Sequence, residues 1–448
     1  MKTFDAIIIG FGKGGKTLAG KLASSGKTVA LIEKSDRMYG GTCINVGCIP
    51  SKSLVNSAAF SARQPGLSFE DKAKLYTAAI TEKRRVTAML RQKNFDKLNQ
   101  MKNVTIFNGT GSFISKTEVR VENGTGIEIV SAPSVYINTG SKPMIPDIKG
   151  LADCKIAYFS ETMMELDTLP KELVILGGGY IGLEFASMYA SFGSHVTVLQ
   201  DGAVFLPKED EDIAAEIKKV LEAKGIAFYI GAAIHEISAP VISFAHEGKE
   251  YSIKADAILV AAGRTANIDG LNLRAAGVEV NKRGIVVDEH RRTSAENIFA
   301  MGDVCGGLQF TYVSLDDFRV IWSGLTGGTY SANERKNVPY SVFIDPPFSR
   351  VGMNEREARA AGHTITVANL PAGAVPKAQV LRKPEGMLKA VIDADTKKIL
   401  GAMLFCSESY EIINIVKLAM DAGVDYTVLR DQIFTHPTMA ESLNDLFA

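Results

Sequence analysis

Short apolar runs alternate with helix-like segments along most of the chain. Runs of strand length occur at residues 6–9, 28–32, 104–111, 118–121 and 135–138, and again at 173–176, 195–199 and 257–262. Segments with the pattern of helices occur at residues 17–25, 53–62, 70–99, 183–192 and 213–225. Strands that alternate with helices in this way predict an α/β fold built on parallel sheets.

The pattern changes after residue 337. Strands are predicted at residues 342–344, 379–380, 387–392 and 399–406, and an amphipathic helix at 409–422. This last part of the chain therefore predicts a separate α+β domain. A chain of 448 residues is too long for one ordinary core, so several domains are expected.

Three glycines follow the first predicted strand. Gly10, Gly12 and Gly15 have the G-x-G-x-x-G spacing, and the strand after the next helix is closed by Glu33, 18 residues past Gly15. Such glycines let the backbone approach a pyrophosphate at the helix N-terminus, and the acid can accept from a ribose hydroxyl. Strand, glycines, helix, strand and acid together predict a dinucleotide site.

The same unit occurs a second time. Gly177, Gly179 and Gly182 repeat the spacing, and the residue 18 positions past Gly182 is Gln200. An internal repeat of this kind favours two dinucleotides, a fixed flavin and a diffusible nicotinamide that delivers hydride to it. An acid at this position favours NADH and an arginine favours NADPH. Gln200 is neither; Asp201 follows and no arginine lies between 200 and 210, so NADH is favoured and NADPH stays open.

Residues 40–52, GGTCINVGCIPSK, hold two of the five cysteines. Cys43 and Cys48 are five positions apart among small residues, so a helical or tightly turned path can bring their sulfurs together. A helix N-terminus or a nearby cation would lower a thiol pKa and raise its thiolate fraction. We interpret the pair as a redox dithiol, with a metal pair or two inert buried thiols as the alternatives.

The other cysteines, Cys154, Cys305 and Cys406, are isolated. A zinc site would need further ligands at regular spacing, so no metal site is predicted. We interpret these three as small core residues. Cys305 lies two positions past Asp303, and a redox role for it stays open.

Composition narrows the class of protein further. Lys+Arg and Asp+Glu both number 50, so nothing favours a nucleic acid or a membrane surface as partner. No run reaches the ~18 apolar residues of a membrane span. The chain enters its first strand at once, which leaves no room for a signal peptide, and five cysteines are no secreted disulfide framework. We expect a cytoplasmic protein, in which a close cysteine pair is more often catalytic or metal-binding than structural.

Together these features resemble the class I flavoprotein disulfide reductases, which include glutathione reductase, dihydrolipoamide dehydrogenase and mercuric reductase. The resemblance covers essentially the whole chain. It rests on the cysteine stretch, both fingerprints in that order, Met-Gly-Asp at 301–303, and His-Pro-Thr at 436–438 with Glu441. It implies two Rossmann-like dinucleotide-binding domains and a C-terminal α+β dimerisation domain. We expect FAD in segments 1–148 and 266–336, NAD(P)H in 149–265, and dimerisation in 337–448.

The resemblance also implies roles for the matching residues. Cys48 is similar to the thiol next to the flavin, and Cys43 to the interchange thiol that meets substrate. His436, oriented by Glu441, is similar to the acid–base that serves Cys43 from the other subunit, which implies a homodimer.

Further positions match the family's cofactor sites. Lys52 and Glu184 are similar to an ion pair beside the flavin N5, with a surface lysine and an ordinary helical glutamate as the alternative. Asp303 is similar to a carboxylate on the ribityl chain. The FAD positions implied are Gly10, Gly12, Gly15, Glu33, Gly41, Thr42, Gly140 and Asp303. The NAD(P)H positions implied are Gly177, Gly179, Gly182, Gln200 and Gly263.

A closer likeness is to a bacterial subgroup with the reactive-chlorine-resistance flavoprotein and the hypothiocyanous acid reductases. It rests on residues 306–312, 315–317, 431–437 and 442–447. The subgroup implies reduction of hypothiocyanous acid, an oxidant made by host peroxidases, to thiocyanate. The alternatives are a reductase of a disulfide metabolite such as glutathione or lipoamide, and a reductase of copper(II) or mercury(II). A flavoprotein binding module without activity would leave the dithiol and His436 unexplained.

Overall fold

The first glycine fingerprint lies in a five-stranded parallel sheet of the computed structural model, which describes residues 1–448. Its strands are, across the sheet, β21 (Ile298–Ala300), β8 (Ser134–Ile137), β2 (Ala6–Ile9), β3 (Val29–Glu33) and β4 (Val104–Asn108). Strand β2 is apolar and buried along its whole length, as a central strand covered on both faces must be. Because β21 comes from far along the chain, the chain leaves this sheet and later returns to it.

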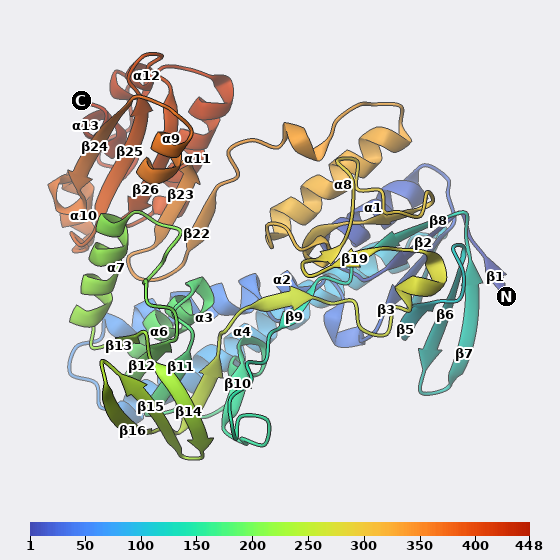
Figure 1. The fold of residues 1–448 in the computed structure, drawn as a ribbon, viewed down its shortest axis with the longest axis horizontal. Coiled ribbons are helices and arrows are strands. Elements are labelled where there is room, and N and C mark those ends of the chain that lie inside the picture. Colours follow the sequence, from blue (N-terminus) through green and yellow to red (C-terminus); the bar gives the residue numbers. More distant parts are fainter.

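A second parallel sheet carries the second fingerprint. Its strands are, across the sheet, β10 (Ala157–Phe159), β17 (Ala257–Val260), β11 (Glu172–Leu176), β12 (His195–Gln200) and β13 (Ala227–Ile230). In each sheet a helix connects two adjacent parallel strands: α1 (Lys13–Ser24) follows β2, and α6 (Tyr180–Phe192) follows β11. Helices α3 (Cys48–Ala62) and α4 (Phe69–Asn99) run between the two sheets (Figure 1).

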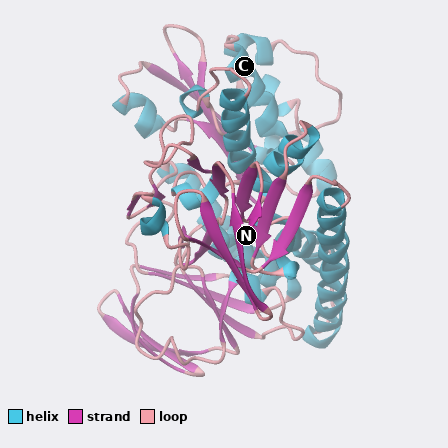
Figure 2. Cartoon of the chain, turned by 90° about the vertical axis from the view of Figure 1, so that its right-hand side faces the viewer, coloured by secondary structure: helices cyan, strands magenta, loops and turns pink.

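The C-terminal part has a different architecture. Its sheet is antiparallel and consists of β22 (Tyr340–Val342), β23 (Phe348–Gly352), β26 (Ile399–Phe405), β25 (Met387–Asp393) and β24 (Ile365–Pro371). Helix α11 (Ser409–Ala422) packs against β23 and β26. This part lies at the opposite end of the molecule from the N-terminus (Figure 1). From the N-terminal side, the strands fill the middle of the molecule, with helices above them and to their right (Figure 2).

The remaining elements complete these layers. The other helices are α2 (Thr42–Asn45), α5 (Ser160–Met163), α7 (Glu211–Ala223), α8 (Thr311–Leu325), α9 (Glu355–Ala360), α10 (Pro376–Leu381), α12 (Tyr426–Arg430) and α13 (Ser442–Leu446). The other strands are β1 (Lys2–Thr3), β5 (Thr110–Phe113), β6 (Glu118–Asn123), β7 (Gly126–Ser131), β9 (Ser141–Pro143), β14 (Ala233–Ser238), β15 (Val241–His246), β16 (Lys249–Lys254), β18 (Arg264–Ala266), β19 (Val280–Asn281) and β20 (Gly284–Ile285).

The predicted fold class is confirmed: two parallel α/β sheets and a C-terminal α+β part. The domain boundaries at 148, 265 and 336 stay a prediction. The strand predicted at 379–380 is wrong, because those residues belong to helix α10, which begins at Pro376. Proline suits the first position of a helix, and two apolar residues are too short a window to indicate a strand. Helix α3 also begins earlier than predicted, at Cys48 instead of residue 53.

The first glycine of each fingerprint has the same structural role. Gly10 has φ +105°, and a Cβ there would lie 2.3 Å from the Asn138 carbonyl oxygen. Gly177 has φ +114°, and its Cβ would lie 2.5 Å from the Ala261 carbonyl oxygen. In both sheets the turn after the central strand therefore passes directly over the neighbouring strand's end, which only glycine permits.

We predict that Gly10→Ala destabilises the protein far more than Gly26→Ala. Gly26 also has positive φ (+88°), but a Cβ there meets nothing within 4 Å. The control should therefore show only the left-handed backbone cost, about 1–2 kcal/mol. At Gly10 the clash should add at least about 2 kcal/mol. Chemical unfolding of both variants checks this; equal destabilisation would contradict it.

Candidate active site

One large cavity, of about 2350 Å³, collects most of the predicted site residues. It is larger than the ~300–1,000 Å³ typical of drug-sized ligands, which suits an extended dinucleotide. The predicted residues that line it are Gly10, Gly12, Glu33, Gly41, Thr42, Cys43, Cys48, Lys52, Gly140, Glu184 and Asp303. They lie in helices and loops that connect the strands of the two parallel sheets, and in the segments around the cysteines.

Other predicted residues do not line this cavity. They are Gly15, Gly177, Gly179, Gly182, Gln200, Gly263, His436 and Glu441. Gly15 packs directly against the turn of the first fingerprint, since a Cβ on Gly15 would lie 2.5 Å from the Gly10 carbonyl oxygen. Gly182 has the same relation to Gly177, at 2.0 Å. Both fingerprints thus pack helix against strand in the same way.

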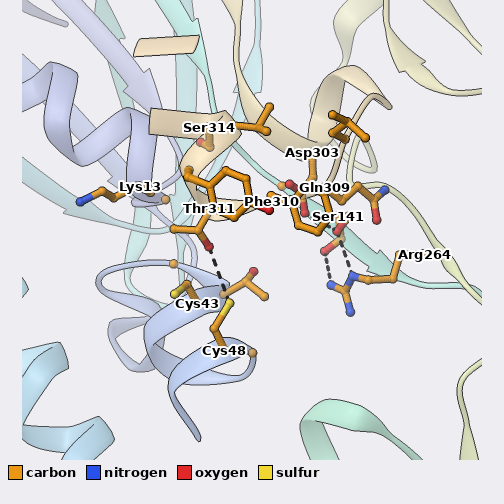
Figure 3. A pocket seen from close by; sticks show the side chains of 18 of the residues that line it. Lys13, Cys43, Cys48, Ser141, Arg264, Asp303, Gln309, Phe310, Thr311 and Ser314 are labelled. Atoms are coloured by element: carbon orange, nitrogen blue, oxygen red, sulfur yellow. Dashed lines mark hydrogen bonds between the residues drawn. The ribbon is translucent and has the colours of Figure 1, made fainter. Parts of the chain in front are cut away.

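The two cysteines lie on separate helices that meet at a break. Cys43 is in α2, and Cys48 is the first residue of α3, with Gly47 preceding it. Both are free thiols, and they lie side by side in the cavity (Figure 3). Thr311, the first residue of α8, places its Oγ1 3.7 Å from the Cys48 sulfur.

Cys48 therefore lies at the N-termini of two helices. Helices α3 and α8 are each 15 residues long, and neither has a side-chain cap at its N-terminus. The free N–H groups and the macrodipole at such an end favour negative charge. Sequence reasoning anticipated the first helix end but missed Thr311, because the contact joins residues far apart in the chain.

The two thiols differ in acidity. A hydrogen bond with Cys43 lowers the pKa of Cys48 to about 6, and Thr311 and the Lys52 charge act in the same direction against burial. The same hydrogen bond, together with burial, raises the pKa of Cys43 well above its usual range. At neutral pH Cys48 is therefore the thiolate, and Cys43 keeps the proton.

Lys52 and Glu184 form an ion pair in the cavity wall. The Lys52 Nζ lies 2.9 and 2.7 Å from the two Glu184 carboxylate oxygens. Phe343 completes the pair: its backbone N–H donates to Glu184 at 2.9 Å, and its ring centroid lies 4.6 Å from the Lys52 Nζ. A paired and hydrogen-bonded arrangement is what partly buried charges require. No local sequence pattern indicates that Phe343 contacts this ion pair.

The first fingerprint suits a flavin dinucleotide. Helix α1 has Gly12 at its N-cap, no side-chain cap and no acidic residue in its first turn, so its N-terminus can receive a pyrophosphate. Lys13 adds a positive charge at the cavity wall. Glu33 accepts hydrogen bonds from the backbone of Phe11 (3.0 Å) and Ser35 (3.3 Å), and burial raises its pKa.

Asp303 lies in the same cavity, close to Ser141 and Arg264 (Figure 3). The Ser141 hydroxyl donates to the Asp303 carboxylate at 2.8 Å, and Arg264 donates to the Ser141 hydroxyl at 2.9 Å. Burial raises the pKa of Asp303. A carboxylate held in this way can accept from the hydroxyls of a ribityl chain, so these residues fit the flavin that the family implies.

The second fingerprint shows no clamp for a ribose 2′-phosphate at Gln200. The Gln200 amide donates to the carbonyl oxygens of Gly202 (2.8 Å) and Val204 (2.9 Å), so its N–H groups are used within its own loop. Asp201 follows and is exposed. A carboxylate next to this position suits a ribose hydroxyl better than a phosphate.

His436 and Glu441 lie on the C-terminal part, outside the cavity. The His436 Nδ1 is 2.8 Å from the Glu441 carboxylate, which fixes the ring. The His436 side chain is 70% exposed, whereas that of Glu441 is 15% exposed. Within one chain, the imidazole therefore does not line the cavity that holds Cys43.

The other cysteines lie outside the cavity. Burial raises the pKa of Cys305 and of Cys406 to about 12 each, so both are poor nucleophiles.

Nowhere do three or more His, Cys, Asp or Glu side chains group together as they would around a metal ion. The chain's helices are all too short or too polar to span a membrane.

Comparisons with known proteins agree on one family. Residues 4–317 match the family model described as pyridine nucleotide-disulphide oxidoreductase, and residues 338–447 match the dimerisation domain of the same family. An Escherichia coli protein described as "Probable pyridine nucleotide-disulfide oxidoreductase RclA" is 48% identical over 100% of this chain and 99% of its own length. A mercuric reductase of Lysinibacillus sphaericus is 33% identical over 98% of this chain and 81% of its own length.

A solved structure is also similar. It is described as a Cu(II) complex of the HOCl-induced flavoprotein disulfide reductase RclA from Escherichia coli. It superimposes with a TM-score of 0.94 at 47% identity, over 100% of this chain and 99% of that chain.

We predict that Cys48 of the reduced protein is alkylated at a half-maximal rate near pH 6, and Cys43 only at much higher pH. The rate should rise with pH because only the thiolate reacts. Iodoacetamide labelling across about pH 5 to 9, read by peptide mass spectrometry, checks this. In Cys43→Ala the hydrogen-bond donor is lost, so the Cys48 midpoint should move upward; an unchanged midpoint would refute the proposed cause.

Proposed function

The chain belongs to the pyridine nucleotide-disulphide oxidoreductase family, and we propose that it is an NAD(P)H-dependent flavoenzyme that reduces hypothiocyanous acid to thiocyanate. The observation that carries the proposal is the thiol pair in the cavity: Cys43 and Cys48 lie side by side (Figure 3), and the Thr311 hydroxyl contacts the Cys48 sulfur. The pKa of Cys48 is lowered and that of Cys43 is raised, so the two thiols are unequal. Such a pair can receive electrons at one sulfur and pass them to an oxidant at the other. The likeness to an HOCl-induced flavoprotein supports an oxidant as the acceptor.

Different residues of the chain would bind different parts of the cofactor. Asp303 and Glu33 would hold its hydroxyl-bearing parts, the N-terminus of α1 its pyrophosphate, and the Lys52–Glu184 pair its redox end. When bound, FAD supplies the two electrons that a nicotinamide delivers as hydride, and these electrons open the Cys43–Cys48 disulfide. The position of Asp201, with no basic clamp at Gln200, supports NADH as the donor.

The oxidant would react at Cys43. Its thiolate attacks the electrophilic sulfur of hypothiocyanous acid; a sulfur–sulfur bond forms, the sulfur–oxygen bond breaks, and the leaving hydroxide takes a proton to become water. The Cys48 thiolate then attacks the Cys43 sulfur, which releases thiocyanate and closes the disulfide. The sum is NADH plus hypothiocyanous acid to NAD⁺, thiocyanate and water.

Cys43 needs a base for this step, because its pKa is raised and it holds the proton of the pair. We propose that His436, oriented by Glu441, takes this proton and returns it to the leaving group. The ring lies outside the cavity of its own chain, so it would act on Cys43 of the other subunit. The match to a dimerisation domain supports a homodimer.

We predict that hypothiocyanous acid reoxidises the reduced enzyme faster than oxidised glutathione, lipoamide or copper(II) does. The enzyme is reduced with NADH without oxygen and mixed with each acceptor in a stopped-flow instrument. Cys43→Ser should abolish turnover, a loss of at least about 1000-fold, because no nucleophile then meets the acceptor. Comparable rates with all four acceptors would reject the assignment, and full turnover by Cys43→Ser would reject the dithiol mechanism.

We also predict that two inactive variants complement each other. Cys43→Ser and His436→Gln are mixed, dissociated and re-associated, so that about half of the dimers are mixed. Each mixed dimer has one site with an intact Cys43 and an intact His436, so activity should return to about a quarter of the wild-type level. No recovery, with mixed dimers confirmed by native mass spectrometry, would show that His436 does not act between subunits.

A further inference from the structure

A buried carboxylate joins two tyrosines at the edge of the cavity. The Glu209 side chain is fully buried and accepts hydrogen bonds from the hydroxyls of both Tyr180 and Tyr340. The two hydroxyls also lie 3.2 Å from each other, and the ring centroids are 5.5 Å apart. Tyr180 is the first residue of α6 and Tyr340 the first of β22, so Glu209 connects the second parallel sheet to the C-terminal part.

Arg350 provides the opposing charge. One of its terminal nitrogens lies 3.3 Å from Glu209 and donates to the Lys208 carbonyl oxygen at 2.6 Å. The other donates to Glu357, whose side chain is 45% exposed. A fully buried carboxylate with a cation and two hydroxyl donors is satisfied, and it holds the tyrosines in a single arrangement.

Tyr340 also contacts the segment that leads to the cysteines. Its ring lies nearly parallel to that of Phe310, with an interplanar angle of 12° and a centroid separation of 6.1 Å. Phe310 is the N-cap residue of α8, and the next residue is Thr311, which contacts Cys48. Phe310 also stacks on Tyr312, at 5.1 Å and 11°. A continuous set of contacts thus runs from Glu209 to the Cys48 sulfur.

We propose that Glu209 is a positioning residue for the thiol pair: it holds Tyr340 against Phe310 and thereby fixes Thr311 and the N-terminus of α8 against Cys48. The hydroxyl and the helix end stabilise the Cys48 thiolate, so the position of α8 sets part of its acidity. The acidity of Cys48 in the reduced protein does not depend on which oxidant the enzyme reduces.

The groups that face Cys48 come from four helices. They are Cys43 on α2, Lys52 on α3, Glu184 on α6, and Thr311 and Tyr312 on α8. None of them hydrogen-bonds Glu209, whose side chain bonds Tyr180, Tyr340 and Arg350. An effect of Glu209 on Cys48 must therefore act through packing or through its own charge.

The two routes predict opposite signs. Removing a negative charge would lower the pKa of a neighbouring thiol by electrostatics alone. Loosening α8 would instead withdraw the Thr311 hydroxyl and the helix end from the thiolate, which raises the pKa. The direction of the shift therefore distinguishes a positioning residue from a distant charge.

The test measures the pH midpoint of Cys48 alkylation in the reduced, FAD-loaded enzyme, with the flavin content and thermal unfolding of each variant checked alongside. In Glu209→Gln the midpoint should rise by about half a pH unit, the size expected when one weak hydrogen bond to a thiolate is loosened. Tyr340→Phe, which keeps the ring and loses the hydroxyl, should give a smaller shift in the same direction. Glu357→Gln removes the other carboxylate on Arg350 and should leave the midpoint unchanged.

Three results would overturn the proposal. They are an unchanged midpoint in folded Glu209→Gln, a downward shift in that variant, and an equal upward shift in Glu357→Gln. If Glu209→Gln does not fold, Tyr340→Phe decides alone: an upward shift supports the proposal, and an unchanged or lower midpoint rejects it. Because the readout is thiol acidity, a failed assignment of hypothiocyanous acid would leave this result intact.

Discussion

The negative charge on Cys48 is the constraint on which the site depends. A thiolate that lines a cavity is stabilised by donors and positive potential around it, and here they come from separate places: the Cys43 thiol, the Thr311 hydroxyl, two helix N-termini and Lys52. No local motif can supply all of these. The fold must bring α2, α3 and α8 together, and the return of the chain to the first sheet at β21 is what delivers α8 to that point.

Ion pairs that involve buried side chains fix the positions of the parts of the chain relative to one another. Lys389 of the C-terminal sheet is almost fully buried and pairs with Asp210, Asp212 and Glu355. Asp210 is the N-cap residue of α7 and Asp212 lies in its first turn, so Lys389 links the C-terminal sheet to this helix. A buried ion without its partners is costly, so such pairs tolerate only a narrow range of arrangements. The Lys52–Glu184 pair, closed by the Phe343 backbone, applies the same constraint at the cavity itself.

The sequence predicts those helices and turns that are determined by the pattern of nearby residues. Helix α11 begins and ends where its apolar spacing indicates, and the first and third glycines of both fingerprints lie where a Cβ would clash with backbone. Contacts between distant segments leave no such pattern: Thr311 reaches Cys48, and Phe343 reaches Lys52, only because the sheets are assembled. The segment at 379–380 failed for a related reason, since two apolar residues are compatible with either helix or strand until their neighbours decide.

The two glycine fingerprints have the same backbone geometry but differ in the hydrogen bonds that hold their turns in place. In the first, the Asn138 side chain accepts from the Gly15 backbone at 2.9 Å and donates to the Met301 carbonyl oxygen at 2.7 Å, which ties the turn to the returning strand. In the second, the equivalent strand end is Ala261, which has no polar side chain to make such a link. A turn locked on two sides suits a cofactor that stays bound through many cycles. The second turn is held by backbone contacts, among them the hydrogen bond from the Gly177 N–H to the Leu199 carbonyl oxygen at 2.8 Å. A turn with one link fewer would suit a nicotinamide that enters and leaves in each cycle, which is the role we propose for the second fingerprint.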